Sequence, residues 1–433
     1  MRRRSPALIA IALALALTPA AGAATRYAEP GGKGPAAKCP KSKPCDVQVA
    51  VEGAEAGDQV SLAPGTYATA ADEILVDEAI TVRGADKGPL PRILAEGGGF
   101  AVRVTSPGAE LRDFQIEQLG GATAMALFEG EADRMTVSSS GVGACTALGG
   151  ALIRNSFCLG EGGASGFMID AGAGADFTPK LRNVTAVAAD SGPTAYGIRM
   201  GVGSGGRVAL DALNVIASGP ADDVFAGTDG VAGSSAGAAL DHSNFSTTSV
   251  AGAGASVTPP TEAGNQNDEP LLANVGKGDL HQKAGSPTID GGASGADIGS
   301  TDIDGEQREQ GAAPDIGADE IDSEVTGAKV TARKSQDQGG STVRILFKAG
   351  AKEPVSIRAK GSVVVGSKAF ALEPKASRAR GRPKAMQLQL DKGDARKVLS
   401  ALDSGKPAEA KLVVTFKDDA DNTLRVKRSV ELK

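Results

Sequence analysis

Short segments in which hydrophobic and polar residues alternate recur along the middle of the chain. Their starts lie roughly 20 to 30 residues apart, and Gly-rich stretches separate them. The segments span residues 111–116, 132–137, 153–158, 181–186, 210–215 and 240–245. Alternation over several positions predicts a β-strand with one buried face. Further strands are predicted between these segments at 101–104, 124–128, 166–169 and 196–200.

This repeat length matches one coil of a parallel β-solenoid. A strand rises about 3.3 Å per residue, so three short strands and their turns use about 20 to 30 residues. Stacked coils about 4.8 Å apart place equivalent residues in columns, and the inward aliphatic column forms the core. Asp113, Asn155 and Asn183 recur at one offset and are expected at a corner, bonding the backbone of their own turn. A catalytic role is the alternative interpretation of these three residues.

The first residues have the features of an export signal. Arg2, Arg3 and Arg4 precede an apolar run at 7–17, and small residues follow at 21–23. This order predicts a signal peptide over residues 1–23. A membrane anchor is the alternative, but the run is short for a hydrocarbon core of about 30 Å. No other stretch has the length of a span, so we expect no transmembrane segment and a secreted protein, extracellular or loosely associated with the cell wall.

The four cysteines fit an oxidising compartment. Four cysteines allow three pairings, and we predict Cys39–Cys45 and Cys145–Cys158 because each pair closes a short loop. Free thiols buried in the core are the alternative. The spacings do not match a zinc-ligand set.

The start of the repeat region resembles a known fold family. Residues 56–67 read AGDQVSLAPGTY, which is similar to the entry coil of pectate-lyase-like right-handed parallel β-helix proteins. The resemblance implies that a short helix at 45–55 covers the open end of the solenoid. Val47, Val49, Val51 and Ala54 are its expected contacts. Such a helix would also protect an exposed sheet edge.

The end of the repeat region carries the most specific motif, here called the closing motif (residues 285–320). It contains SPTIDGG at 286–292, TDIDGEQR at 301–308 and APDIGADE at 313–320. These elements resemble the choice-of-anchor Q family of secreted β-helix proteins, over roughly residues 26–322. The resemblance implies that they close the C-terminal side of the solenoid, with Ile321 where the family has an aromatic residue. The implied structural residues are Asp290, Asp302, Asp304, Gly305, Arg308, Asp315, Gly317 and Glu320.

Asp302 and Asp304 also allow a metal hypothesis. Their spacing, followed by Gly305, is similar to the start of a calcium loop. The rest of an EF-hand pattern is missing, so a tight turn is the preferred interpretation. In that turn, Asp304 would bond backbone amides and Arg308 would pair with a carboxylate such as Asp290 or Asp315. We expect no cofactor, with calcium at Asp302 and Asp304 as the alternative.

The composition changes after the closing motif. Residues 326–433 contain about 24 basic and about 11 acidic residues, although the whole chain has a net charge of −6. Strands are predicted at 329–333, 342–347, 355–359, 362–365, 384–390, 411–417 and 423–432, with one helix at 394–402. Seven strands in this length predict an immunoglobulin-like β-sandwich at 326–433, after the β-helix at 26–322. The basic run at 375–384 is either a surface for anionic polymers or a solvated loop.

The composition argues against several classes of function but does not identify one. Two histidines argue against a His-rich metal site and a Ser-His-Asp triad, and the absence of Trp weakens a sugar-stacking groove. Nucleic acid is not an expected partner, because basic residues are not interleaved with aromatic ones. We predict a monomer that binds an extracellular polysaccharide or anionic cell-wall polymer without catalysis.

A polysaccharide lyase or glycoside hydrolase is the alternative function, since the fold hosts both binding proteins and enzymes. Arg154, Arg182 and Arg199 could face one groove, whereas Asp170, Asp211 and Asp241 are unevenly spaced and show no metal-ligand pattern. The order of Asp222-Asp223 and the Thr228-Asp229-Gly230 element does not match polygalacturonases. No catalytic residue is therefore assigned.

Overall fold

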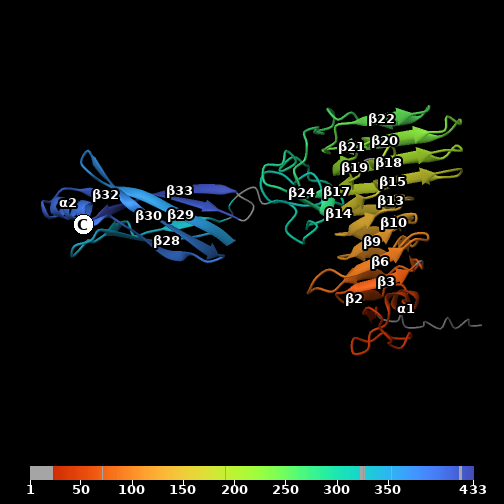
Figure 1. Cartoon of the computed structure of the whole chain (residues 1–433), viewed down its shortest axis with the longest axis horizontal. Helices are drawn as coiled ribbons and strands as arrows, with labels where there is room; N and C mark the ends of the chain where they lie inside the picture. The colour runs from red at the N-terminus through yellow and green to blue at the C-terminus, as the bar shows by residue number, and fades with distance from the viewer. Residues whose placement is uncertain are drawn as a thin grey trace, which may run out of the picture.

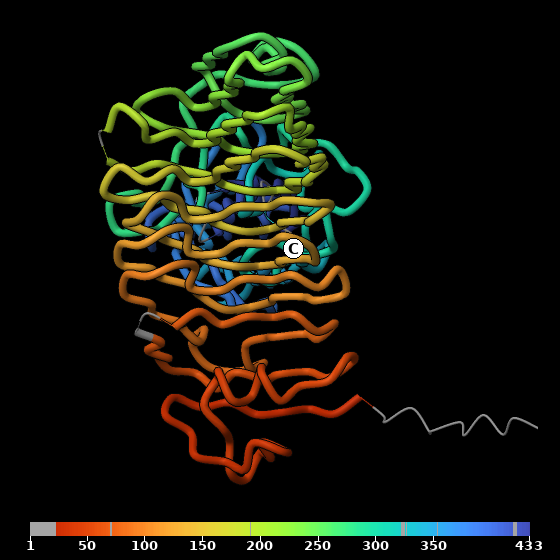
Figure 2. The backbone as a smooth tube through the Cα atoms, turned by 90° about the vertical axis from the view of Figure 1, so that its right-hand side faces the viewer, coloured from red at the N-terminus to blue at the C-terminus, as the bar shows by residue number. Residues whose placement is uncertain are grey.

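The computed structural model describes residues 23–433 except 71, 191, 322–324, 326, 353 and 419–421. The predicted signal peptide, apart from Ala23, lies outside the described residues. Two long sheets dominate the chain up to residue 257, and every pairing within them is parallel. Figure 1 and Figure 2 show the resulting stack of coils. The predicted right-handed parallel β-helix is confirmed.

The larger sheet supplies two of the three sides of each coil. Its 15 strands are β1 (Thr25–Ala28), β2 (Gln59–Leu62), β3 (Thr66–Ala70), β5 (Thr81–Gly84), β6 (Arg92–Glu96), β8 (Glu110–Arg112), β9 (Gln115–Leu119), β11 (Glu131–Asp133), β12 (Thr136–Ser139), β14 (Leu152–Gly160), β16 (Asp176–Phe177), β17 (Lys180–Ala188), β19 (Arg207–Ser218), β21 (Ser235–Asp241) and β23 (Ala255–Val257). The third side is an eight-stranded sheet. Its strands are β4 (Ile74–Val76), β7 (Val102–Val104), β10 (Thr123–Leu127), β13 (Gly143–Ala147), β15 (Ser165–Ala171), β18 (Tyr196–Val202), β20 (Asp222–Thr228) and β22 (Thr248–Ala251).

Inward residues of successive coils stack in register and form the core. One column contains Val82, Leu111, Ala132, Ile153, Leu181, Ala212 and Leu240, all of them buried. Five of the six predicted repeat segments begin in this column. The segment predicted at 210–215 is two residues out of register, because Ala212 rather than Leu210 aligns with Leu181. Leu210 and Ala212 are both buried, so hydrophobicity alone could not show which of the two occupies the repeat position.

A column of left-handed residues forms one corner of the coils. The residues with positive φ there are Asp113 (62°), Arg134 (53°), Asn155 (48°), Asn183 (51°) and Asn214 (56°). Asn and Asp tolerate this conformation better than other non-glycine residues. The corner position matches the prediction for Asp113, Asn155 and Asn183.

The corner amides bond between coils instead of bonding their own turn. The Asn155 amide donates to Asp133 at 3.0 Å, Asn183 to Asn155 at 2.9 Å, and Asn214 to Asn183 at 2.9 Å. All three asparagines are completely buried. These bonds therefore satisfy polar groups that the core would otherwise leave without a partner.

A short helix covers the N-terminal end of the coils, as predicted. Helix α1 (Val47–Glu52) begins after Asp46, whose side chain accepts a bond from the Gln48 amide. Val47, Val51 and Ala54 are buried as expected, and Val49 is partly buried. Ala50 is completely buried and was not among the predicted contacts.

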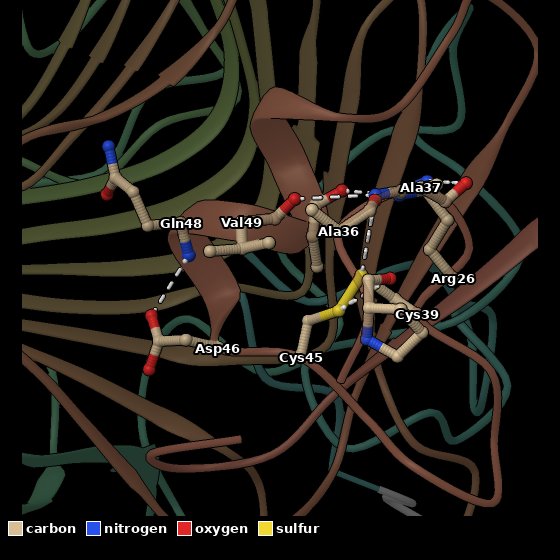
Figure 3. The surroundings of a disulfide bond; sticks show 10 residues. Arg26, Ala36, Ala37, Cys39, Cys45, Asp46, Gln48 and Val49 are labelled. Carbon is tan, nitrogen blue, oxygen red and sulfur yellow. Dashed lines mark hydrogen bonds between the residues drawn. A yellow bond between two sulfur atoms is a disulfide. The ribbon is translucent and has the colours of Figure 1, made fainter. Parts of the chain in front are cut away.

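Arg26 attaches this helix to the first strand. Its guanidinium donates to the carbonyl oxygens of Ala50 at 2.8 Å and Ala36 at 2.5 Å, beside the Cys39–Cys45 disulfide (Figure 3). The second disulfide joins Cys145 to Cys158 within the solenoid core, with both residues completely buried. Both predicted disulfides are present in the structure.

After β23 the chain returns along the side of the solenoid. This side segment (residues 259–321) contains β24 (Leu272–Asn274), the 3-10 helix η1 (Val275–Lys277) and β25 (Asp279–Gln282). It bonds the corner column: the Asn183 amide donates to Ile298 O and the Asn214 amide to Ala293 O. In Figure 1 the segment lies beside β14 and β17. The closing motif was expected to close the C-terminal side of the solenoid, but it packs against the flank of earlier coils.

A separate apolar cluster holds the side segment in place. Phe157, Leu159 and Val187 face outward from β14 and β17, and Leu280, Ile303 and Ala318 of the side segment pack on them. The outward apolar positions on these strands are therefore a docking surface for the chain's own side segment.

The C-terminal region forms two antiparallel sheets around its own core. The three-stranded sheet contains β26 (Lys329–Thr331), β28 (Arg344–Gly350) and β31 (Lys384–Gln389). The five-stranded sheet contains β27 (Ser335–Gln336), β29 (Pro354–Val365), β30 (Lys368–Arg380), β32 (Ala408–Lys417) and β33 (Thr423–Leu432). Among the described strands of this region, β27 and β33 alone pair in parallel. Helix α2 (Lys392–Asp403) packs Ala395 and Val398 on the core.

The arrangement is compatible with the predicted sandwich, with three differences in its strands: two predicted strands are one, and neither β27 nor β30 was predicted. The strands predicted at 355–359 and 362–365 are one strand, β29, with an irregularity between Ala359 and Gly361. Strand β30 was not predicted, because its sequence is mostly charged and small residues. It pairs with β29 along almost its whole length. No helix among the described residues is long and apolar enough to cross a membrane.

The asparagine ladder predicts a specific loss of stability. Asn183→Ala removes bonds to Asn155, Asn214 and Ile298 O and leaves a β-carbon at positive φ. We expect the free energy of unfolding, measured by urea denaturation, to fall by about 2–4 kcal/mol. Asn183→Gly removes the same bonds but accepts the conformation, so it should lose about 1 kcal/mol less. A loss below about 0.5 kcal/mol in both variants would contradict a stabilising ladder.

Candidate functional site

Arg308 lies at the centre of the closing motif and is only 1% exposed. Its guanidinium donates to the carbonyl oxygens of Ala318 and Gly317 at 2.8 Å and of Asp315 at 3.0 Å. It also lies 3.4 Å from the Glu320 carboxylate. Arg308 thus binds the backbone of the last motif element and holds that element in a fixed turn.

The partner of Arg308 differs from the expectation. The sequence suggested Asp290 or Asp315, but the ion pair within the described residues is with Glu320. The Asp315 side chain accepts the backbone amides of Asp290 at 2.7 Å and Ile321 at 2.8 Å instead. The Asp290 side chain accepts the amide of Ala312 at 2.8 Å.

Asp302 is a second acceptor of backbone amides. One of its oxygens accepts from Asp304 at 3.1 Å and Glu306 at 2.7 Å, and the other accepts from Glu320 at 3.1 Å. The predicted tight turn exists, but Asp302 bonds its amides, whereas Asp304 was expected to do so. Asp302 is completely buried. Its carboxylate therefore stabilises the turn by accepting these backbone amides.

Gly317 marks the contact between the closing motif and the coils. Its φ is +107°, and a β-carbon there would lie 2.8 Å from Ile216 and 2.9 Å from the Thr185 hydroxyl. Gly305 has a φ of +81° in the turn that follows Asp302, which is a left-handed conformation that favours glycine. Both glycines are thus required by backbone geometry.

Burial changes the protonation of the motif carboxylates. It raises the pKa of Asp315 to about 7, of Asp319 to about 6 and of Glu320 to about 8. Burial is the largest cause in each case. It outweighs the backbone amides and a nearby positive charge that favour the ionised form, Arg308 for Asp315 and Glu320 and His281 for Asp319. Burial also lowers the pKa of Arg308.

The Asp304 side chain lies beside His281, a histidine that was not among the residues predicted from the sequence. His281 Nε2 lies 3.2 Å from an Asp304 oxygen, and His281 Nδ1 lies 2.6 Å from Asp279. The hydrogen bond to Asp304 is the main reason that the pKa of His281 is raised to about 9. The same bond lowers the pKa of Asp304.

One group of described residues has the composition and proximity of a metal site. Ligand atoms of His281, Asp304 and Asp319 all lie within 4.8 Å of one another. The predicted pair, Asp302 and Asp304, is not this group, because only Asp304 belongs to it. The sequence held a signal for His281, because Asp279 and His281 stand two residues apart on the same side of β25, but it held none for Asp319.

The arginines suggested for a groove lie on different sides of the coils. Arg154 and Arg182 project from the larger sheet, where Arg182 pairs with Asp211 at 2.5 Å. Arg199 projects from the eight-stranded sheet and pairs with Asp170 at 2.7 Å. These residues therefore do not converge on one site.

The acidic residues that the sequence analysis set aside make local bonds. Asp223 accepts the amides of Ser246 and Thr247, and Asp222 accepts the Ser249 hydroxyl. Asp241 lies 2.8 Å from Nδ1 of the neighbouring His242.

A groove not foreseen from the sequence lies where the side segment meets β12 and β14. It has a volume of about 230 Å³, and its walls include Glu117, Glu161 and Lys277 over Phe157. Burial, followed by the charges of Glu117 and Asp190, raises the pKa of Glu161. No repeat pattern marks Glu161, because it lies in a turn after β14.

The outer face of the five-stranded C-terminal sheet is strongly basic. Alternate exposed positions carry Arg358 and Lys360 on β29, Lys411 on β32, and Arg425 and Lys427 on β33. Strand pairing places Arg358, Thr415 and Arg425 in one row. The adjacent row contains Lys360, Val413 and Lys427.

The basic run at 375–384 continues this face. Arg378 and Arg380 lie on β30, whose register with Ser356 and Pro354 places them at the edge of the same surface. The run is therefore mostly strand, and only its end forms the turn to β31.

Comparisons with known proteins include a distant structural match. No protein-family model matches the chain, and no curated protein matches it in sequence. Among solved structures, the chain is similar to pectate lyase Pel9A, with a TM-score of 0.36 and 12% identity over 69% of this chain and 97% of that chain. The parallel β-helix assigned here rests on the strand pairing itself.

The raised pKa values predict that stability falls as pH rises. Between about pH 4 and pH 8 the folded chain keeps protons on Asp315, Asp319 and Glu320 that the unfolded chain releases. His281 acts in the same direction between about pH 6.5 and pH 9, because its folded pKa is also raised. We expect the melting temperature to decrease steadily from pH 5 to pH 9.

Glu320→Gln tests the source of this pH dependence. The variant keeps the shape of the side chain but cannot ionise, so its melting temperature should depend less on pH than that of the unchanged chain. Glu309→Gln is the matched control, because Glu309 is an exposed carboxylate of the same motif. An identical slope for Glu320→Gln and the unchanged chain would contradict the assignment.

Proposed function

We propose that the protein is an exported β-helix protein that binds anionic polysaccharide or cell-wall polymer without catalysis. The observation that carries this proposal is the basic outer face of the five-stranded sheet. Lys411 lies 3.8 Å from Glu409 on this face, whereas Arg358, Lys360, Arg425 and Lys427 form no ion pair with other described residues, so their charges are available to a partner.

The geometry of this face suits an extended polymer. Neighbouring strands are about 4.8 Å apart and alternate residues on one strand about 7 Å apart, so the cations form a flat lattice. An acidic polymer with one charge per sugar could contact several of them at once. Each contact at an exposed site is weak, but their sum gives affinity that depends on salt.

The chemistry of the face favours a polysaccharide over nucleic acid. The rows contain Thr415 and Val413 between the cations, and no aromatic side chain is placed there for base stacking. Two disulfides fit an oxidising compartment, which supports export. The proposed ligand is therefore an extracellular acidic glycan or wall polymer.

We also propose distant membership of the choice-of-anchor Q family. The support is that the three sequence elements of the closing motif fold as one unit around Arg308. Asp290, Asp302, Asp315 and Glu320 each fill a defined hydrogen-bonding role in that unit. Such membership would imply secretion and fold, and would leave the ligand open.

A binding experiment with matched variants tests the proposed function. The variant Arg358→Gln, Lys360→Gln and Arg425→Gln removes three charges from the basic face. We expect at least a tenfold weaker affinity for alginate or pectin in low salt, measured by calorimetry.

The control removes the same charge elsewhere in the same domain. Lys392, Arg396 and Lys406 are exposed around helix α2, and their change to Gln should leave affinity within about twofold. An equal loss of affinity in both triple variants would mean that net charge alone explains the binding, and it would contradict the proposed binding face. New ultraviolet absorbance from unsaturated products during incubation would instead favour the lyase alternative.

A further inference from the structure

We propose that His281, Asp304 and Asp319 form a binding site for a divalent transition-metal ion, with zinc as the best-suited ion. Asp279 is the residue that orients the histidine. The three ligands come from three separate parts of the side segment: β25, the turn at 302–305 and the last element of the closing motif.

The distances fit one ion between the three side chains. His281 Nε2 and the Asp304 oxygen are 3.2 Å apart, and all three ligand atoms lie within 4.8 Å of one another. Ligands at about 2.0–2.2 Å from a tetrahedral zinc ion lie about 3.4 Å apart. Small side-chain movements would therefore complete the geometry, with a fourth position left for solvent or a ligand.

The histidine is held in the orientation that a metal ligand needs. Asp279 lies 2.6 Å from Nδ1, which leaves Nε2 facing Asp304 and Asp319. The Phe157 ring meets the imidazole edge to face, with centroids 5.0 Å apart and planes at 89°. A carboxylate on the second ring nitrogen is the usual support of a metal-binding histidine.

The two carboxylates are also held in place. Asp319 is 6% exposed, and one of its oxygens accepts the Gln282 amide at 2.7 Å. Asp304 belongs to the turn that Asp302 closes through the amides of Asp304 and Glu306. The site therefore needs little reorganisation to bind an ion.

The ligand set favours a transition metal over calcium. Calcium requires six to eight oxygen ligands, whereas one imidazole and two carboxylates suit zinc, cobalt or nickel. A proton on His281 competes with the ion, because the protonated ring pairs with Asp279 and Asp304. A bound ion would link β25 to the closing motif and stiffen the side segment.

Calorimetric titration of the untagged, chelator-treated full chain with zinc chloride at pH 7.5 tests the site. We expect one zinc ion per chain, and a cobalt(II) complex with visible absorption typical of low coordination number. His281→Gln should weaken the affinity for zinc at least tenfold. His242→Gln is the matched control, because His242 is the other histidine and also has a carboxylate, Asp241, at Nδ1.

A second variant protects the test from misfolding. Asp304 is 57% exposed at its side chain, so Asp304→Asn should fold and should also weaken zinc at least tenfold. Circular dichroism checks each variant. Zinc affinity unchanged in both His281→Gln and Asp304→Asn, no zinc binding at 100 µM, or calcium binding as tightly as zinc would each overturn the proposal.

Discussion

The stacking of coils through lateral main-chain hydrogen bonds is the constraint on which the rest of the structure depends. Because each strand pairs with the equivalent strand of the next coil, every inward residue meets its counterpart, and every corner meets a corner. The buried column through Leu111, Ile153 and Leu181 is one result of this register. The chain of hydrogen bonds from the Asp133 carboxylate through Asn155 and Asn183 to Asn214 is another, because the adjacent coil supplies a partner for each polar group buried at the corner.

The same requirement explains the closing motif. Its acidic residues attract attention as catalytic or metal-binding groups, yet most of them accept backbone amides of a segment that has no regular sheet of its own. In the coils, strand pairing satisfies the backbone amides. In the closing motif, the carboxylates of Asp302, Asp315 and Glu320 accept these amides instead, and Arg308 donates to backbone carbonyl oxygens such as that of Ala318. Asp304 and Asp319 instead keep oxygens close to His281.

Sequence reasoning reached the fold because the repeat is periodic and local. The alternation, the corner residues and both cysteine pairs could be predicted from spacing, and the cap helix from the resemblance of residues 56–67 to the entry coil of a known fold. The position of the closing motif could not, because it depends on contacts between residues more than 100 positions apart, such as the Ala318 amide with the Thr185 hydroxyl at 3.1 Å. Outward Phe157 and Leu159 were the available signal, since apolar residues on the outer side of a coil require a cover.

The candidate sites were harder to predict for the same reason. His281 lies more than 20 residues before Asp304 and more than 35 before Asp319 in the sequence, and only the fold brings the three together. Strand β30 was missed because edge strands tolerate charged and small residues that carry no hydrophobic pattern. Its pairing with β29 then placed the cations of two strands on one surface.

The Cys145–Cys158 bond has a consequence for the order of events during maturation. The bond joins β13 to β14 inside the core, and neither sulfur-bearing residue is exposed once the adjacent coils are stacked. An oxidant or an isomerase can therefore reach these thiols only while this part of the solenoid is still open. Covalent linkage must precede closure, and in the finished protein a reductant gains access only when the coils separate.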